Sequence, residues 1–135
     1  MKPSMIDTDT LSYFLRHHPD IVEKFQQYLK KYDKINLSII SYYEMLGGLK
    51  HKDAYRQLDK FQVFMKDSTV LLPVTDYSCQ IASEIYAMLR KQGKPLDNMD
   101  ILIASIAIEN ELVLVTHNRK HFGRIKNLEI EDWSI

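Results

Sequence analysis

Short apolar segments that alternate with amphipathic ones constrain the fold of this chain most strongly. Apolar runs of β-strand length occur at residues 5–6, 35–40, 70–72 and 112–115, with a weaker one at 128–130. Between them, apolar residues recur at helical spacing, as in Leu11, Phe14 and Leu15. Strands that alternate with helices favour parallel pairing. We therefore expect an α/β fold, a three-layer α/β/α sandwich around a central, mostly parallel sheet of four to five strands.

One helical segment is apolar on nearly every side. After its first turn, the stretch DNMDILIASIAIEN at 97–110 contains almost no polar residue, which is typical of a helix buried against a sheet. No repeat, low-complexity segment or linker interrupts the 135 residues. We expect a single domain over residues 1–135, which is long enough to bury an ordinary core.

Charge and cysteine content exclude several classes of protein. Eighteen basic residues balance eighteen acidic ones, so any binding of nucleic acid requires basic groups gathered on one face. Cys79 is the only cysteine, which excludes an internal disulfide and a cysteine-based zinc site. We find no signal-peptide pattern and no apolar run long enough for a membrane helix. We expect a cytoplasmic protein without membrane contact.

Four polar side chains occupy equivalent places relative to the expected strands. Asp7, Glu44, Asp100 and Asn118 each lie where a strand ends or where the following helix begins. In an open parallel sheet, ligands bind beyond the carboxyl ends of the strands, where residues distant in sequence meet. The pattern predicts one shared pocket.

Some of these carboxylates also have local explanations. Asp9 suits the cap of a helix that begins near Thr10, so we assign Asp9 to capping and Asp7 to the pocket. Ser41 and Glu44 match the S-x-x-E capping box, a structural alternative for Glu44.

The helix at 97–110 poses the same choice. Asp97 and Asp100 both lie at its start, and we assign the cap to Asp97 and the pocket to Asp100. A carboxylate in the first turn is favourable in either role, because the helix dipole attracts negative charge there.

Carboxylates that share a pocket require a counter-charge. Two of them ~4 Å apart repel by about 4 kcal/mol at an effective dielectric constant of 20. Oxygen ligands without cysteine or clustered histidine select hard cations, which favours Mg²⁺ or Mn²⁺ over Zn²⁺. Such ions suit phosphate chemistry, since they polarise a phosphoryl oxygen and activate water.

Several motifs together resemble a PIN-domain ribonuclease of the VapC toxin type. They are MIDTDTLSYFL, SIISYYEMLGGL, the G-x-P-x-D-x-x-D-x-x-I-A-S helix start, V-T-x-N-x-x-x-F and LEIEDW, and they span almost the whole chain. The resemblance implies an endoribonuclease that uses Mg²⁺ or Mn²⁺ to cut structured RNA, often a transfer RNA. It makes Asp7, Glu44 and Asp100 the acidic triad that binds the metal, with Asn118 as an auxiliary residue where many relatives carry a fourth acid.

The resemblance also implies partners. The family forms homodimers and is neutralised by a small VapB-type antitoxin, which can place a basic side chain in the acidic pocket. Close to Asn118, the basic residues Arg119, Lys120, His121 and Arg124 are candidates for contact with RNA phosphates, although a solvated helix face explains them equally well.

Two other functions remain open. Asp7-Thr8-Asp9 resembles the D-x-D opening of haloacid-dehalogenase phosphatases, but Leu11 replaces the Thr or Val of that pattern. A non-catalytic PIN module that only binds protein is the second alternative, against which the complete triad argues.

Overall fold

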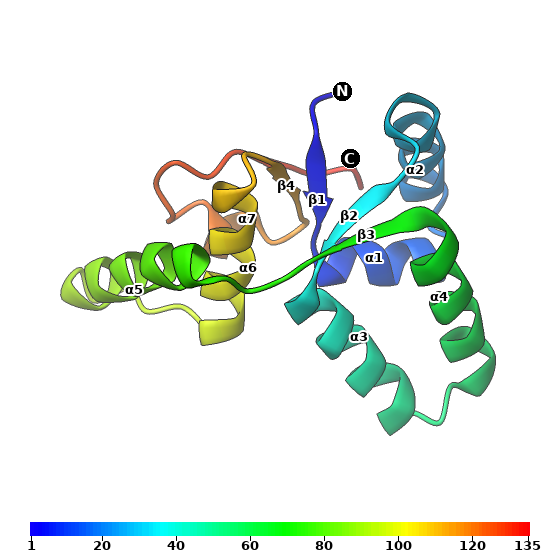
Figure 1. Ribbon diagram of the computed structural model, residues 1–135, viewed down its shortest axis with the longest axis horizontal. Helices are drawn as coiled ribbons and strands as arrows, with labels where there is room; N and C mark the ends of the chain where they lie inside the picture. Colours follow the sequence, from blue (N-terminus) through cyan, green and yellow to red (C-terminus); the bar gives the residue numbers. More distant parts are fainter.

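Five parallel strands form the centre of the protein in a computed structural model that describes residues 1–135 (Figure 1). The strand order is β3-β2-β1-β4-β5, and every pair is parallel. The strands are β1 (Ser4–Ile6), β2 (Ile35–Ser38), β3 (Thr69–Leu72), β4 (Val113–Val115) and β5 (Ile130–Glu131). The predicted parallel sheet is confirmed.

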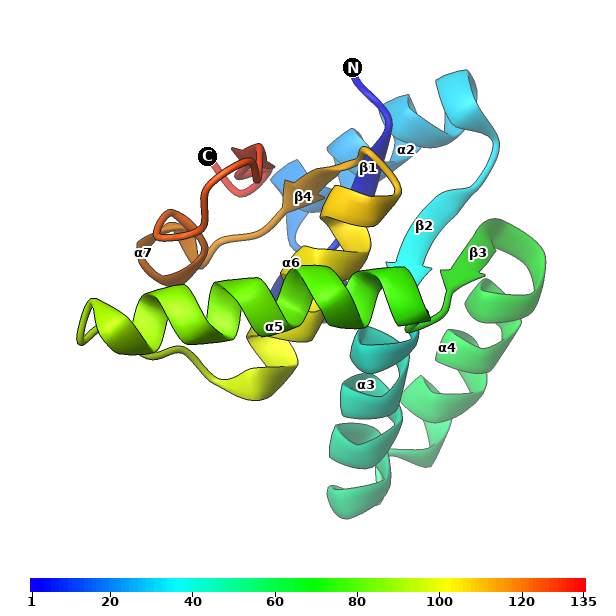
Figure 2. The ribbon, with the colours of Figure 1, turned by 60° about the vertical axis from the view of Figure 1, so that its left-hand side comes forward.

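Seven helices cover the two faces of the sheet. They are α1 (Thr8–Leu15), α2 (Pro19–Tyr32), α3 (Ile39–His51), α4 (Tyr55–Ser68), α5 (Asp76–Lys91), α6 (Asn98–Glu109) and α7 (Arg119–Phe122). Helices α1 to α4 contribute to one core, and α5 to α7 contribute to the other (Figures 1 and 2). The α/β/α sandwich is therefore confirmed.

Side chains of the central strands alternate between these two cores. Met5 and Leu114 pack with α5 and α6, whereas Ile6 and Val115 pack with the aromatic core of α2. All residues of β1 and β4 are buried, as expected for parallel strands covered on both faces. Six residues of α6 are buried, which confirms the prediction from its apolar sequence. None of the seven helices is long and apolar enough to cross a bilayer.

The strand register aligns the positions that follow the three central strands. Ile6 pairs with Leu37 of β2 and with Val115 of β4. Asp7 follows Ile6, and its backbone N–H donates to the Val115 carbonyl at 2.9 Å. The next residues along β1, β2 and β4 therefore emerge together at the carboxyl edge of the sheet.

Helix α3 begins earlier than the sequence suggested. The strand expected over 35–40 ends at Ser38, because Ser38 has extended backbone angles and caps α3. Its Oγ accepts a hydrogen bond from the Ser41 backbone N–H at 3.0 Å. The capping box of Ser41 and Glu44 is therefore wrong, and Glu44 lies in the second turn of α3.

Helix α1 also begins earlier, at Thr8 rather than near Thr10. Asp7 is its N-cap and accepts from the Thr8 backbone N–H at 2.8 Å, so assigning the cap to Asp9 was wrong. The cap predicted at Asp97 is confirmed, since its Oδ1 accepts from the Met99 N–H at 2.7 Å.

The cap of α3 generates a stability prediction. Ser38→Ala should lower the free energy of unfolding by about 1 kcal/mol, because the buried Ser41 N–H loses its acceptor. Denaturant titration followed by circular dichroism measures the difference. An unchanged midpoint would show that Ser38 does not cap this helix.

Candidate functional site

Asp7 is the most deeply buried acidic residue of the protein, with 5% of its surface exposed. One carboxylate oxygen accepts from the Thr8 N–H at 2.8 Å, and the other accepts from the Thr116 hydroxyl at 2.7 Å. Burial raises the pKa of Asp7 to about 8, with further contributions from the charges of Asp9 and Asp100. The two hydrogen bonds lower this pKa only in part.

Thr116 orients the Asp7 carboxylate from the end of β4. Its side chain is fully buried, and its oxygen accepts from the Asn118 backbone N–H at 3.0 Å. Because that oxygen already accepts one hydrogen bond, its hydroxyl hydrogen is directed to Asp7. Thr116 belongs to the V-T-x-N motif, but its contact with Asp7 was not predicted from the sequence.

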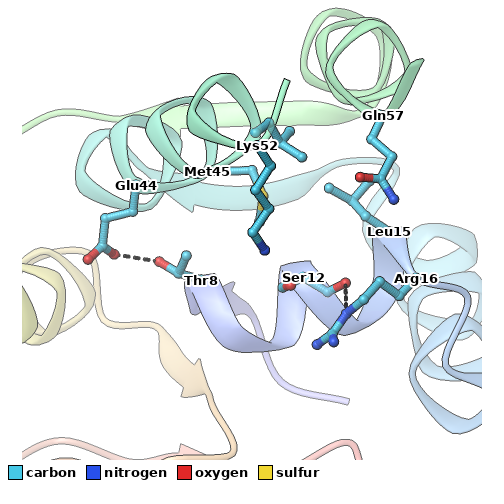
Figure 3. A pocket seen from close by; sticks show the side chains of 10 residues that line it. Thr8, Ser12, Leu15, Arg16, Glu44, Met45, Lys52 and Gln57 are labelled. Carbon is cyan, nitrogen blue, oxygen red and sulfur yellow. Dashed lines mark hydrogen bonds between the residues drawn. The ribbon is translucent and has the colours of Figure 1, made fainter. Parts of the chain in front are cut away.

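Glu44 approaches the site from α3. Its Oε1 accepts from the Thr8 hydroxyl at 2.7 Å, the contact drawn as a dashed line in Figure 3. The same hydroxyl lies 2.9 Å from Ser41 Oγ, so Thr8 joins α1 to two residues of α3. Glu44 Oε2 accepts no hydrogen bond from the protein, which leaves this oxygen free for a ligand.

Asp100 faces the same site from the first turn of α6. It is partly buried, and its carboxylate accepts no hydrogen bond from the protein. Burial raises the pKa of Asp100, and the charges of Asp97, Glu44 and Asp9 raise it further, whereas His121 lowers it. These interactions bring Asp100 and Glu44 into one electrostatic group with Asp7.

Asp9 belongs to this group as well. Its Oδ2 accepts from the His117 backbone N–H at 3.2 Å, and its Oδ1 accepts from the Thr10 N–H at 2.6 Å. It is the strongest charged contributor to the raised pKa of Asp7. The sequence predicted a capping role for Asp9, and its place beside the site was not predicted.

Asn118 lies next to the site rather than among the carboxylates. Its amide nitrogen is 3.0 Å from His121 Nδ1, and its backbone N–H donates to Thr116. Its Oδ1 accepts no hydrogen bond from the protein.

The basic residues that follow Asn118 differ in how exposed their side chains are to solvent. Arg119 and Lys120 are exposed on α7. Arg124 is half-buried, and its guanidinium is 3.5 Å from the Pro95 carbonyl. Arg119 and Lys120 are therefore freer to contact an anionic ligand than Arg124.

These donors suit a hard divalent cation, because the available side-chain atoms are oxygens. The raised pKa of Asp7 and Asp100 shows how unfavourable the fully ionised group is without a counter-charge. The ligand set is not closed, since no three His, Cys, Asp or Glu side chains converge closely enough to hold one metal ion.

Comparison with known proteins gives a consistent result. The family model of the PIN domain matches residues 4–128. Ribonuclease VapC1 of Haemophilus influenzae is 30% identical over 130 residues, covering 96% of this chain and 97% of that protein. The tRNA(fMet)-specific endonuclease VapC of Shigella flexneri is 29% identical over 134 residues, covering 96% and 97%.

A solved structure agrees with these relatives. VapBC2 from Rickettsia felis, bound to a DNA fragment from its promoter, superposes with a TM-score of 0.85 and 30% sequence identity. The match covers 96% of this chain and 98% of that one.

The buried carboxylate generates a prediction about pH. The folded-state pKa of Asp7, about 8, lies above the value of 3.8 for a free side chain, so its ionisation increasingly opposes folding as pH rises from about 4 to 8. In EDTA, Asp7→Asn should therefore gain stability over the wild type between pH 5 and pH 8, by roughly 3–4 kcal/mol.

Denaturant titrations at the two pH values measure this gain. The exposed Asp59 offers a matched control, and Asp59→Asn should follow the wild type at both. A constant difference between Asp7→Asn and the wild type would contradict the shifted ionisation.

Proposed function

The chain belongs to the PIN-domain family and, within it, to the VapC ribonucleases, and from this membership we propose that it is a divalent-metal-dependent endoribonuclease. Its substrate is structured RNA, with transfer RNA as the first candidate, because the Shigella flexneri relative is named for cutting tRNA(fMet). Cleavage of that RNA stops translation, and the protein acts as the toxin of a type II toxin-antitoxin pair.

The buried Asp7 carboxylate is the observation that carries the proposal. A carboxylate that is 5% exposed and surrounded by other acids is unfavourable unless a cation binds beside it. Strongly raised pKa values concentrate at functional sites. Asp7 also caps α1, but a capping role alone does not explain why other acids lie around it.

We assign Asp7, Glu44 and Asp100 as ligands of a Mg²⁺ or Mn²⁺ ion. Thr8 and Thr116 hold Asp7 in a fixed orientation, so this ligand is preorganised. Asp100 is not restrained by any hydrogen bond, so its carboxylate would be free to turn toward a bound ion. Asn118 acts as an auxiliary residue through its unpaired Oδ1.

The chemistry of the site follows from these assignments. When bound, a divalent ion polarises the scissile phosphate and lowers the pKa of a coordinated water. The free Oε2 of Glu44 can orient the attacking water. Three basic residues follow Asn118 closely in sequence and can hold the RNA backbone by contacts to its phosphates. They are Arg119, Lys120 and, as the weaker candidate, Arg124.

A VapB-type antitoxin is the proposed protein partner. This rests on the structural neighbours, several of which were solved as VapBC complexes. A basic side chain of such a partner would neutralise the acidic group in place of the metal. The homodimer expected from the family stays a prediction.

The surroundings of Asp7 disfavour the alternative function of a phosphatase. A haloacid-dehalogenase-like phosphatase would attack with the first acid of Asp7-Thr8-Asp9. Asp7 is buried, and both of its oxygens already accept hydrogen bonds within the protein, so it is poorly placed to attack a substrate phosphorus atom. The chain should therefore cut RNA and leave a generic phosphomonoester intact.

Substitution of the acids tests the assignment. Asp100→Asn and Asp7→Asn should each reduce Mg²⁺- or Mn²⁺-dependent RNA cleavage by at least about 100-fold, because each removes an anionic ligand of the metal. The measurement is cleavage of total RNA by purified, partner-free protein, with mapping of the new ends and an EDTA control.

Asp97→Asn is the matched control on the same helix. Asp97 caps α6 and is exposed, so its variant should cut RNA nearly as fast as the wild type. Full activity of Asp100→Asn, or equal loss in both variants, would refute the assigned roles. A wild-type protein that cuts no RNA with either metal would support the non-catalytic binding module instead.

A further inference from the structure

A cavity of about 320 Å³ opens beside Glu44, and the proposed function leaves it without a role. Two helices supply facing rows of side chains at i, i+4 and i+8 spacing, which places each row on one helix face. The rows are Thr8, Ser12 and Arg16 from α1 and Glu44, Gly48 and Lys52 from α3.

The lining of the cavity carries charges of both signs. Glu44 accepts from Thr8 and belongs to the acidic group. The backbones of Arg16 and Lys52 lie about 12 Å further along the helices at 1.5 Å per residue, and the Lys52 amine extends toward α1 between Thr8 and Ser12 (Figure 3). A single ligand could thus contact the acidic site and the cations together.

The cation of Lys52 is unpaired. Lys52 forms no hydrogen bond or ion pair with the protein, and its side chain extends from the end of α3 toward α1 (Figure 3). Arg16 has only a 3.4 Å contact with the Ser12 carbonyl and lies over the Tyr13 ring. Both residues are helix C-caps, where positive charge is favourable, but the dipole does not require the two side chains to line one cavity.

Gly48 keeps the middle of the cavity open. A Cβ at this position would meet no atom within 4 Å, so the space is not closed by packing. The volume lies at the small end of the roughly 300–1,000 Å³ typical of ligand pockets.

We propose that this cavity is a subsite for the RNA backbone, in which Lys52, assisted by Arg16, binds a phosphate neighbouring the scissile one. The inference rests on the proposed function and adds a substrate contact to it. An RNA strand whose scissile phosphate lies at the metal must continue away from the carboxylates. The cavity adjoins the carboxylates through Glu44, and Lys52 and Arg16 supply cations in its lining.

Charge reversal at Lys52 tests the subsite. Lys52→Glu should lower kcat/KM for unfractionated transfer RNA with Mn²⁺ roughly tenfold, and Lys52→Gln should reduce the salt dependence of RNA binding by about one phosphate contact. Lys50 is exposed on the same last turn of α3 but does not line the cavity, so Lys50→Glu should change kcat/KM less than twofold.

A steric variant tests the same subsite without a change of charge. Gly48→Leu should fill the cavity and lower RNA affinity several-fold. Gly47→Leu is its matched control, because Gly47 also has open space around its Cβ position and does not line the cavity. Both substitutions replace a helical glycine and should preserve or raise stability.

Binding of transfer RNA in EDTA, measured by fluorescence anisotropy, separates the subsite from the proposed function. If the wild type binds and cuts RNA, and Lys52→Glu and Gly48→Leu bind RNA with the same affinity, the subsite is overturned and the proposed function stands. Metal-independent RNA binding that weakens in both variants, without any cleavage by the wild type, supports the subsite and refutes the nuclease. A third outcome is that Lys52→Glu and Gly48→Leu bind RNA like the wild type but no longer bind a co-expressed VapB-type partner. This outcome would assign the cavity to the partner and overturn the proposal.

Discussion

Parallel pairing of β1 between β2 and β4 is the constraint on which the functional site depends. Because Ile6 is in register with Leu37 and Val115, the three strands end at one level. Residues that follow them, including Asp7 and Thr116, are brought together although they are separated by more than a hundred positions in sequence. Helices α1 and α3 start directly from these ends, so Thr8 and Glu44 reach the same place without any long loop.

Two threonines donate hydrogen bonds that partly stabilise the buried Asp7 carboxylate. Burial of Asp7 among other acids is unfavourable, and the hydrogen bonds from Thr8 and Thr116 offset only part of this cost. On the proposed function, a cation or a basic side chain of the partner should therefore stabilise this site. A site that lowers stability until its ligand arrives is the usual compromise between stability and activity.

The parallel sheet was predictable because strand-length apolar runs are local features. The assignment of Asp7, Glu44 and Asp100 to one metal site stays a prediction. The start of α1 was misjudged, since Asp7 is both the cap of the helix and a buried member of the acidic group. The role of Thr116 depends on β4 lying next to β1, and that neighbour relation is absent from any local pattern. The cavity between Glu44 and Lys52 likewise exists only because α1 packs against α3.

The central claim is that Asp7, Glu44 and Asp100 share one divalent ion. Anomalous scattering from a crystal of the protein soaked in Mn²⁺ tests this directly. The predicted result is a single strong peak at the carboxyl edge of the sheet, with oxygens of Asp7 and Asp100 at about 2.0–2.3 Å and Glu44 bound directly or through water. A peak at another place, or Asp7 and Asp100 still unliganded at saturating Mn²⁺, would contradict the account.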